Sequence, residues 1–450
     1  MRPEIAACYG SERLPRYTSY PTAPNFSEDI NDGRYGEWLG AISAHETVSL
    51  YLHVPFCRSM CWYCGCHTSI VKRKQPIEVY AAALRCEIAM IAARAKHRLK
   101  VGHIHFGGGT PTIMRPEALT DLVESLRHSF FVLPNAEVAV EIDPRTLTAE
   151  MSDALGYCGV NRASLGVQSF DPLVQRLINR EQSFEQTASA TDRLRQAGVS
   201  GINFDLIYGL RGQTVASCVE TVRQCLELSP DRLSVFGYAH VPSFKKHQRK
   251  IDEASLPGGA ERHRQSEAIG EALQAAGYVR IGLDHFALPT DPMAAAQRNG
   301  RLHRNFQGYT TDPSHVLIGL GASSIGKLRQ GYVQNEVSTR GYLERIASET
   351  LATRKGYALT AEDRLRGEII ERLMCDFRVN IDEICSRHGR QPASLLRASA
   401  RLENLVSEGI VNIDGASLLI PEQSRFLVRN VAAAFDAHLE GATRTFSRAV

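Results

Sequence analysis

Residues 49–66 read SLYLHVPFCRSMCWYCGC, a short apolar strand pattern followed at once by four cysteines. The spacing is Cys57-x3-Cys61-x2-Cys64, and a fourth cysteine follows two positions later. Three thiolates on one tight loop can bind three irons of a [4Fe–4S] cubane and leave the fourth iron without a protein ligand. We therefore expect a metal cluster with one open iron, placed directly after the first strand of a sheet.

Two other interpretations of this loop remain open at the level of spacing. One is a zinc site in which Cys66 or His67 supplies the fourth ligand. The other is an electron-transfer cluster with four protein ligands. Both predict that no cofactor pocket lies beside the cysteines, so the residues elsewhere in the chain decide between them.

The composition indicates a globular, cytoplasmic protein with more than one structural unit. The chain has 450 residues, 43% of them hydrophobic, and a formal net charge of only +3. This near balance of charge gives no reason to expect nucleic acid or a membrane as a partner. The N-terminus lacks a signal-peptide core, and four of the 11 cysteines fall within ten residues. Such clustering in a reducing compartment favours metal binding over disulfides.

From residue 48 the chain alternates short β-branched runs with amphipathic helical stretches. This alternation predicts a parallel sheet with crossover helices, in about six units. Six units are too few for a closed eight-stranded barrel, so the expected α/β fold is a partial (β/α)6 TIM-like barrel. The predicted strands are 49–54, 102–106, 136–143, 161–167, 201–209 and 232–238, and the main predicted helices are 76–95, 116–130, 171–197, 214–228 and 258–276.

We divide the chain into four segments. Residues 1–45, rich in Pro and Tyr, form an extended arm over the barrel, and residues 46–300 form the catalytic partial barrel. Residues 301–360 hold a polar-aromatic loop and a Gly-rich apolar connecting segment. Residues 361–450 form a mainly helical, winged-helix-like domain with a small hairpin at 412–422.

Polar residues stand where nearly every predicted strand ends. They include Glu141, Gln168, Asp205 and His240, and the second strand runs into GGGTPT at 107–112. The carboxyl ends of parallel strands form the usual active face of such sheets. We expect the three glycines to let backbone amides approach a charged ligand. A neighbouring carboxylate, Asp143, is better explained as a helix cap.

These segments together resemble the radical S-adenosylmethionine superfamily and, within it, the oxygen-independent coproporphyrinogen III oxidase (coproporphyrinogen dehydrogenase) family. The resemblance covers nearly the whole chain. The segments that carry it are RYTSYPTA (16–23), HVPFCRSMCWYCGC (53–66), HFGGGTPT (105–112), EIDPRT (141–146), LGVQSF (165–170), NREQ (179–182), DLIYGL (205–210), DRLSVFGYAHVP (231–242) and LHRNFQGYTT (302–311). One departure is Arg211-Gly212, where a proline and a lysine are expected.

The resemblance implies a role for each matching residue. Cys57, Cys61 and Cys64 ligate the [4Fe–4S] cluster, and two molecules of S-adenosylmethionine bind. The first is held by Tyr51, Gly108, Glu141 and Ile325. The second is held by Tyr63, Gly109, Thr110, Gln168, Arg180, Asp205 and Ala239. The catalytic candidates are Cys66, which is not a cluster ligand, and Phe306 and Gln307.

The implied reaction converts two propionates of coproporphyrinogen III to vinyl groups by means of a 5′-deoxyadenosyl radical, giving protoporphyrinogen IX. A flavodoxin- or ferredoxin-type electron donor and a monomeric state are implied as well. Arginine suits bidentate contacts with carboxylates. The basic candidates for the substrate propionates are Lys245, Lys246, Arg249, Lys250, Arg298, Arg301 and Arg304. The alternatives are a heme-binding chaperone of the same family and, more distantly, a radical methyltransferase.

Overall fold

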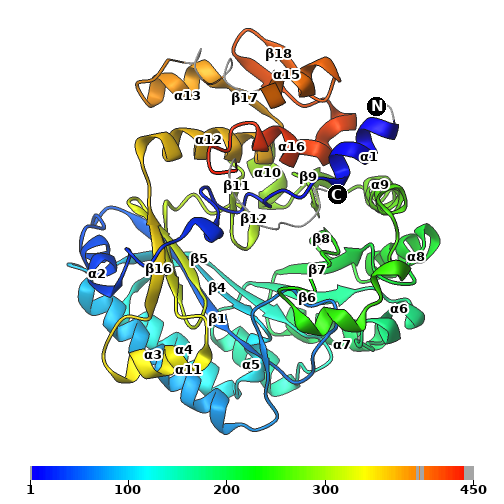
Figure 1. The fold of residues 1–450 in the computed structure, drawn as a ribbon. Coiled ribbons are helices and arrows are strands. Elements are labelled where there is room, and N and C mark those ends of the chain that lie inside the picture. The colour runs from blue at the N-terminus through cyan, green and yellow to red at the C-terminus, as the bar shows by residue number, and fades with distance from the viewer. Residues whose placement is uncertain (1–2, 392–394, 396–399, 440–450) are drawn as a thin grey trace.

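The computed structural model describes residues 3–391, 395 and 400–439, and its centre is an open, curved sheet (Figure 1). Six parallel strands form the middle of that sheet, each followed by at least one helix, which confirms the predicted (β/α)6 arrangement. The strands are β1 (Thr47–Val54), β4 (Lys100–Gly108), β5 (Phe131–Ile142), β6 (Arg162–Gln168), β7 (Gly201–Tyr208) and β8 (Arg232–Gly237). The helices are α3 (Gln75–Arg94), α4 (Pro116–Ser129), α5 (Ala149–Tyr157), α6 (Pro172–Leu177), α7 (Phe184–Gln196), α8 (Val215–Glu227) and α9 (Gly259–Ala275).

The single helix expected at 171–197 is two helices. Helix α6 ends at Leu177, and α7 starts after Ser183, whose side chain accepts a hydrogen bond from the Gln186 amide in a capping box. A capping box satisfies backbone donors that would otherwise be orphaned, and so fixes a new helix start. The break lets Arg180 leave the helical path and turn toward the cysteine loop.

The sheet is wider than the sequence patterns predict, because it has 12 strands. On the far side of β1, β13 (Val316–Leu320) adds a seventh parallel strand, followed by antiparallel β14 (Ile325–Leu328), β15 (Gly331–Asn335) and β16 (Thr353–Ala358). At the other edge, β10 (His285–Ala287) and β9 (Val279–Ile281) pair antiparallel beyond β8. Every residue of β13 is buried, and so short an apolar run carries no periodicity from which a strand could be assigned.

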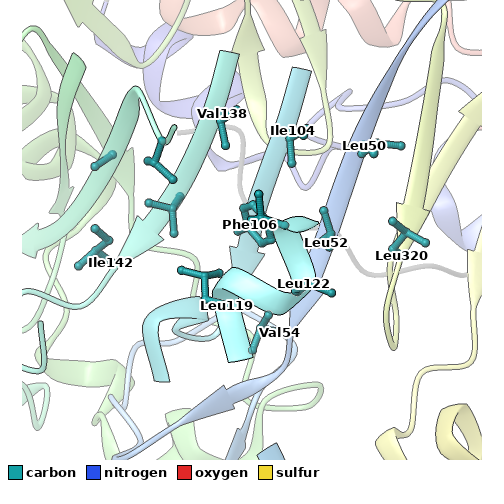
Figure 2. Packing of buried hydrophobic residues seen from close by; sticks show 14 of the residues in the cluster. Leu50, Leu52, Val54, Ile104, Phe106, Leu119, Leu122, Val138, Ile142 and Leu320 are labelled. Carbon is teal, nitrogen blue, oxygen red and sulfur yellow. The ribbon is translucent and has the colours of Figure 1, made fainter. Parts of the chain in front are cut away.

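Strand alternation separates an apolar face from a polar one. Leu50, Leu52 and Val54 of β1 face the outer helices, where they join Phe106 and the α4 side chain Leu122 in the main core (Figure 2). Successive side chains of a strand point to opposite faces, so the intervening residues face the interior. Those interior residues are polar on most strands, and they line one cavity. They are Ser49, His103, His105, Glu137, Glu141, Arg162, Ser164, Asn203, Asp205, Arg232 and Ser234.

The N-terminal arm links two hydrophobic cores. The expectation of an extended arm is wrong at both ends, because α1 (Pro3–Ser11) and α2 (Asp32–Gly40) are helical. Tyr17 and Tyr20 lie in the core of the C-terminal segment, whereas Tyr35 and Trp38 lie in the core of the sheet. Figure 1 shows the arm running between these two parts, from α1 to α2. The arm therefore lies over the mouth of the sheet rather than outside it.

The C-terminal segment packs around α12 (Ala361–Asp376), α13 (Ile381–Arg387), α15 (Ala400–Ser407) and α16 (Val428–Ala433). The hairpin expected at 412–422 is present as β18 (Asn412–Asp414) and β19 (Ser417–Leu419), which pair with β17 (Arg378–Asn380). Parts of the segment expected at 361–450, namely 392–394, 396–399 and 440–450, lie outside the described residues. Across the described ranges, no helix combines the length and the apolar character that crossing a membrane requires.

Candidate active site

The cysteine loop follows β1 and is braced by two short strands, β2 (Phe56–Cys57) and β3 (Ser69–Ile70). Two hydroxyl groups lie against the first thiol: Thr68 Oγ1 is 3.3 Å and Thr110 Oγ1 is 3.5 Å from Cys57 Sγ. Hydrogen bonds to cluster sulfurs stabilise their negative charge and tune the cluster. The surroundings of Cys57 thus suit a thiolate ligand.

The second thiol faces two guanidinium groups. Arg180 Nη1 lies 3.6 Å and Arg145 Nη2 lies 3.9 Å from Cys61 Sγ. Asp143 holds both arginines in place, with Oδ2 at 2.6 Å from Arg145 Nη2 and at 3.4 Å from Arg180 Nη1. The expectation that Asp143 is a helix cap is therefore wrong, since Thr148 caps α5. The sequence interpretation also missed Arg145, whose role depends on a residue 84 positions away.

The third and fourth cysteines interact with each other. A hydrogen bond with the Cys66 thiol, aided by the nearby His247 and Lys245 side chains, lowers the pKa of Cys64 to about 6. The same hydrogen bond, and burial, raise the pKa of Cys66. Cys64 therefore has the character of a thiolate ligand, and Cys66 that of a neutral thiol beside it.

The groups around these sulfurs suit a cubane, whose thiolate-bound irons carry net negative charge. Structural zinc requires four ligands converging tetrahedrally on a single ion, whereas a cubane binds each thiolate through a different iron. Positive and hydroxylic groups around the sulfurs complete the match to an anionic cluster.

A distant segment fixes the backbone of the cysteine loop. The 3-10 turn η3 (Lys246–Lys250) follows β8, and it approaches the loop with three donors. Gln248 Nε2 binds the Tyr63 carbonyl at 2.9 Å, His247 Nε2 contacts the Cys64 carbonyl at 2.8 Å, and Lys245 Nζ binds the Cys66 carbonyl at 2.8 Å. Lys245 was a candidate for binding a substrate carboxylate, but its ammonium group is engaged here.

The GGG stretch works differently from the expectation. The amide of Gly108 donates to Glu141 Oε2 at 2.9 Å, and the amides of Gly109 and Thr110 donate to the carbonyls of Val54 and Phe56, both at 2.8 Å. These three amides are thus already paired within the protein. The glycines allow close packing instead: a Cβ on Gly108, at φ +114°, would lie 2.7 Å from the His53 ring.

Three of the predicted site residues meet in the interior cavity. Glu141, Asp205 and Gln307 line it together, although they come from β5, β7 and the turn between β11 (His303–Asn305) and β12 (Gly308–Thr310). Ser164 Oγ and Asn203 Nδ2 each donate to Asp205 at 2.8 Å, while burial raises the pKa of Asp205 to about 6. The sequence interpretation missed Asn203 and Ser164, whose alternation with apolar residues along the strands was the available signal.

Glu141 belongs to a chain of imidazole and phenol groups. His105 Nε2 lies 3.3 Å from Glu141 Oε1, and Tyr51 Oη lies 2.9 Å from His53 Nδ1. The His53 Nε2 contacts the carbonyl of His67 at 2.9 Å, which ties this chain to the cysteine loop. Burial opposes ionisation of Glu141, but the bonds from His105 and Gly108 outweigh it and keep the pKa of Glu141 low. The residue is an anion that faces the cavity.

The remaining predicted site residues lie on several different elements around the cysteine loop and the cavity. Gln168 has a left-handed φ of 68°, and Arg180 Nη2 donates to the Gly166 carbonyl at 2.6 Å, so both lie at the end of β6. The Ala239 carbonyl shares Gln248 with the Tyr63 carbonyl. The backbone of Ile325 lies against Gly319, and Gly319 is the residue of β13 that pairs with Tyr51 of β1. Phe306 contacts the Tyr332 ring, with 6.1 Å between the ring centroids.

Known proteins resemble the whole of this arrangement. The family model of the Radical SAM superfamily matches residues 51–225, and that of the HemN C-terminal domain matches 359–427. The chain is 62% identical over 450 residues to an oxygen-independent coproporphyrinogen III oxidase of Bradyrhizobium diazoefficiens, with 100% of both chains covered. It is 38% identical over 441 residues to that of Escherichia coli K12, covering 97% of this chain and 96% of the relative.

A solved structure agrees with these relatives. The structure described as coproporphyrinogen III oxidase (HemN) from Escherichia coli, a radical SAM enzyme, matches with a TM-score of 0.90 at 37% identity. The match covers 95% of this chain and 100% of that one. The radical SAM superfamily uses a [4Fe–4S] cluster and S-adenosylmethionine, and the cysteine loop described above fits that cluster. The match of fold, cysteine loop and sequence places the chain in the oxygen-independent coproporphyrinogen III oxidase family of the radical SAM superfamily.

Proposed function

We propose that the chain catalyses the oxygen-independent oxidative decarboxylation of two propionates of coproporphyrinogen III, giving the two vinyl groups of protoporphyrinogen IX. The observation that carries this proposal is the position of the cysteine loop: three thiols with donors at their sulfurs stand beside a polar cavity lined by Glu141, Asp205 and Gln307. Relatives that match the full length of the chain bear the name of this activity.

Cys57, Cys61 and Cys64 would hold the [4Fe–4S] cluster. When bound, the reduced cluster and S-adenosylmethionine supply a 5′-deoxyadenosyl radical strong enough to take a hydrogen from an unactivated propionate carbon. The protein's own contribution is positioning. Thr68 and Thr110 would orient Cys57, and the two arginines that Asp143 holds would face Cys61.

We propose two adenosyl sites in this chamber, because two decarboxylations consume two radical equivalents. Tyr51, Gly108, Glu141 and Ile325 would hold the first molecule, beside the open iron. Tyr63, Gly109, Thr110, Gln168, Arg180, Asp205 and Ala239 would hold the second. Glu141 supports the assignment of the first site, because its anionic carboxylate faces the cavity and can accept hydrogen bonds from the hydroxyl groups of a bound ribose.

The wider setting follows from the same assignment. We propose that a flavodoxin- or ferredoxin-type carrier supplies the electrons and that the chain works as a monomer in the cytoplasm. We also propose the four-part division at 1–45, 46–300, 301–360 and 361–450, supported by separate hydrophobic cores in the sheet and the C-terminal segment.

Strictly anaerobic turnover tests the proposal. Reduced holoprotein given S-adenosylmethionine and coproporphyrinogen III should release CO2, 5′-deoxyadenosine and a divinyl product, with most turnover lost in Gln307→Ala and Cys66→Ala at unchanged iron content. A heme chaperone would instead bind heme stably and release no CO2 above an uncoupled background. That second result, obtained at saturating reductant, would overturn the assignment.

A further inference from the structure

A second cavity, of ≈ 200 Å³, lies beside the candidate active site, and most of its lining residues have no role in the chemistry described so far. Its walls come from three parts of the chain: the edge of the sheet around β8, the N-terminal arm, and the C-terminal segment near α16. Phe236 lines both this second cavity and the interior one. Ala239 also lines the second cavity, and its carbonyl accepts a hydrogen bond from Gln248, which holds the cysteine loop. The two cavities therefore share Phe236 as a lining residue.

Positive charge dominates this second cavity. Seven arginines and three carboxylates line it, which leaves an excess of four positive charges. Arg280 is paired with Glu267 at 3.1 Å. The carboxylate of Asp284 is already in contact with an imidazole, since its Oδ1 lies 2.7 Å from His285 Nδ1. Burial opposes ionisation of Asp284, but His285 and the charges of Arg304 and Arg16 outweigh it and lower its pKa. The acids present cannot neutralise the arginines.

Two of the arginines are available to a ligand. Arg304 is half-buried, its guanidinium lies over the Tyr309 ring at 4.4 Å, and its buried Nε and Nη1 atoms lack hydrogen-bond partners among the described residues. Arg16, on the arm, makes no hydrogen bond or ion pair with any described residue, although its side chain faces the cavity. A guanidinium stays protonated at any working pH, so an unpaired one in a cavity calls for an anion.

A third arginine fixes the arm at this place. Arg429 of α16 donates to the carbonyl of Pro15 at 2.9 Å and also to that of Leu14. The arm residue Arg16 follows these two carbonyls directly. The position of Arg16 in the cavity is thus set by the C-terminal segment, even though the two residues are more than 400 positions apart.

We propose that this arginine cavity binds propionate carboxylates of the tetrapyrrole that are not reacting, and so presents the opposite edge of the macrocycle to the interior cavity. The inference rests on the proposed function, because it takes its substrate class from it. Planar guanidinium groups bind carboxylates bidentately, which fixes orientation as well as affinity. Pockets for drug-sized molecules span roughly 300–1,000 Å³, so a smaller cavity suits side chains rather than a whole macrocycle.

Binding of an unreactive porphyrin tests the proposal without turnover. Coproporphyrin III, with four carboxylates, is titrated by fluorescence into anaerobically reconstituted holoprotein, and protoporphyrin IX, with two, serves as comparison. A hydrogen bond to a charged group is worth about 1.5–3 kcal/mol, so Arg16→Gln and Arg304→Gln should each weaken coproporphyrin III binding about tenfold or more. Arg16→Lys should retain part of the affinity, and protoporphyrin IX, which keeps the two non-reacting propionates, should lose affinity by a similar factor.

The matched control is Arg34→Gln, on the same arm, where Arg34 is 56% exposed and pairs with Glu37 at 3.3 Å. It should bind coproporphyrin III as the wild type does, and S-adenosylmethionine affinity should be unchanged in all variants. Undiminished coproporphyrin III binding in both arginine variants would overturn the proposal, as would an equal loss of S-adenosylmethionine affinity. If Arg304→Gln does not fold, Arg16→Gln decides alone, because that side chain supports no other residue.

Failure of the proposed function gives a different result. Wild-type protein that binds coproporphyrin III through Arg16 but releases no CO2 under reducing conditions would overturn the activity and leave the carboxylate site intact. Normal decarboxylation in wild type, with full porphyrin affinity and turnover in the variants, would overturn the carboxylate site alone. If inorganic phosphate bound this cavity as strongly as coproporphyrin III does, the cavity would be assigned to small anions. That result would also overturn the proposal.

Discussion

Gln248 Nε2 donates a hydrogen bond to the carbonyl of Tyr63 at 2.9 Å, although the two residues are 185 positions apart. Gln248 is fully buried, also reaches the Ala239 carbonyl at 3.2 Å, and accepts from the Val241 amide at 2.6 Å. A single side chain from beyond β8 therefore holds the shape of the cysteine loop, together with its neighbours Lys245 and His247.

Replacement of Gln248 by Ala should loosen the cluster without touching a ligand. Each buried polar group left without a partner costs about 1–3 kcal/mol, so we expect a lower melting temperature and faster iron loss to a chelator. Both are measured anaerobically, by calorimetry and by the decay of cluster absorbance. Lys246→Ala, on the same turn but exposed, is the control. Equal iron retention in the two variants would show that the loop holds its own shape.

The cysteines should separate into three ligands and one bystander. Anaerobically purified protein should contain about four irons per chain, as a cubane requires. Cys57→Ala, Cys61→Ala and Cys64→Ala should each lose most of that iron, whereas Cys66→Ala should keep it. Iron and labile sulfide analysis gives the answer. Stoichiometric zinc in the wild-type protein would contradict the cluster assignment.

Glu141→Ala should weaken binding of S-adenosylmethionine about tenfold or more, since a hydrogen bond to a charged group is worth about 1.5–3 kcal/mol. The cluster should remain, because Glu141 is not a ligand, and its absorbance and iron content serve as the control. Isothermal titration under anaerobic conditions measures the affinity. An unchanged dissociation constant would reduce Glu141 to its structural bond with the Gly108 amide.

Glu87 should make stability fall with rising pH. Burial raises its pKa from 4.5 to about 7, despite hydrogen bonds from the Gly321 amide, Tyr342 and Asn335. Between pH 4.5 and about pH 7, Glu87 is protonated in the folded state and ionised in the unfolded state. The loss of folding stability caused by Glu87 is therefore absent below about pH 4.5 and complete above about pH 7. Its size is on the order of 3 kcal/mol.

Glu87→Gln tests this dependence because an amide does not titrate. We expect the variant to be less stable than wild type at pH 5, since its NH2 group faces buried donors, and the gap should narrow by pH 8. Melting temperatures of both proteins over that range provide the comparison. A gap that is constant with pH would show that Glu87 is ionised in the folded protein throughout.

Much of the fold could be predicted because its signals are local. The six β/α units follow from apolar periodicities that each span fewer than about 20 residues, and each predicted strand of the set is present. The helix expected at 171–197 failed at its middle, where the Ser183 capping box outweighs a continuing helical pattern. Strands β13 to β16 were missed, because such short runs carry too little periodicity and gain their structure from pairing, β13 with β1 and the others in series beyond it.

The candidate site was predicted unevenly for the same reason. Cys57, Cys61 and Cys64 lie within eight positions, so their spacing indicates a metal site, although spacing alone left zinc open. The groups that contact those sulfurs do not follow from spacing, since Arg145 acquires its role from its contacts with Cys61 and Asp143. Spacing also did not reveal that the Gly109 and Thr110 amides are paired with backbone carbonyls. A contact between side chains far apart in sequence leaves no trace in the spacing of either one.

The sequence by itself determined the cluster motif, the alternation of strands and helices, and the polar residues at the strand ends, because spacing and periodicity are properties of neighbouring residues. Only the tertiary structure decided which side chains converge. It placed Gln248 and Lys245 on the cysteine loop and gathered Arg16 and Arg304 in one cavity. Convergence of this kind is created when packing buries the apolar faces and leaves the polar ones facing a common interior.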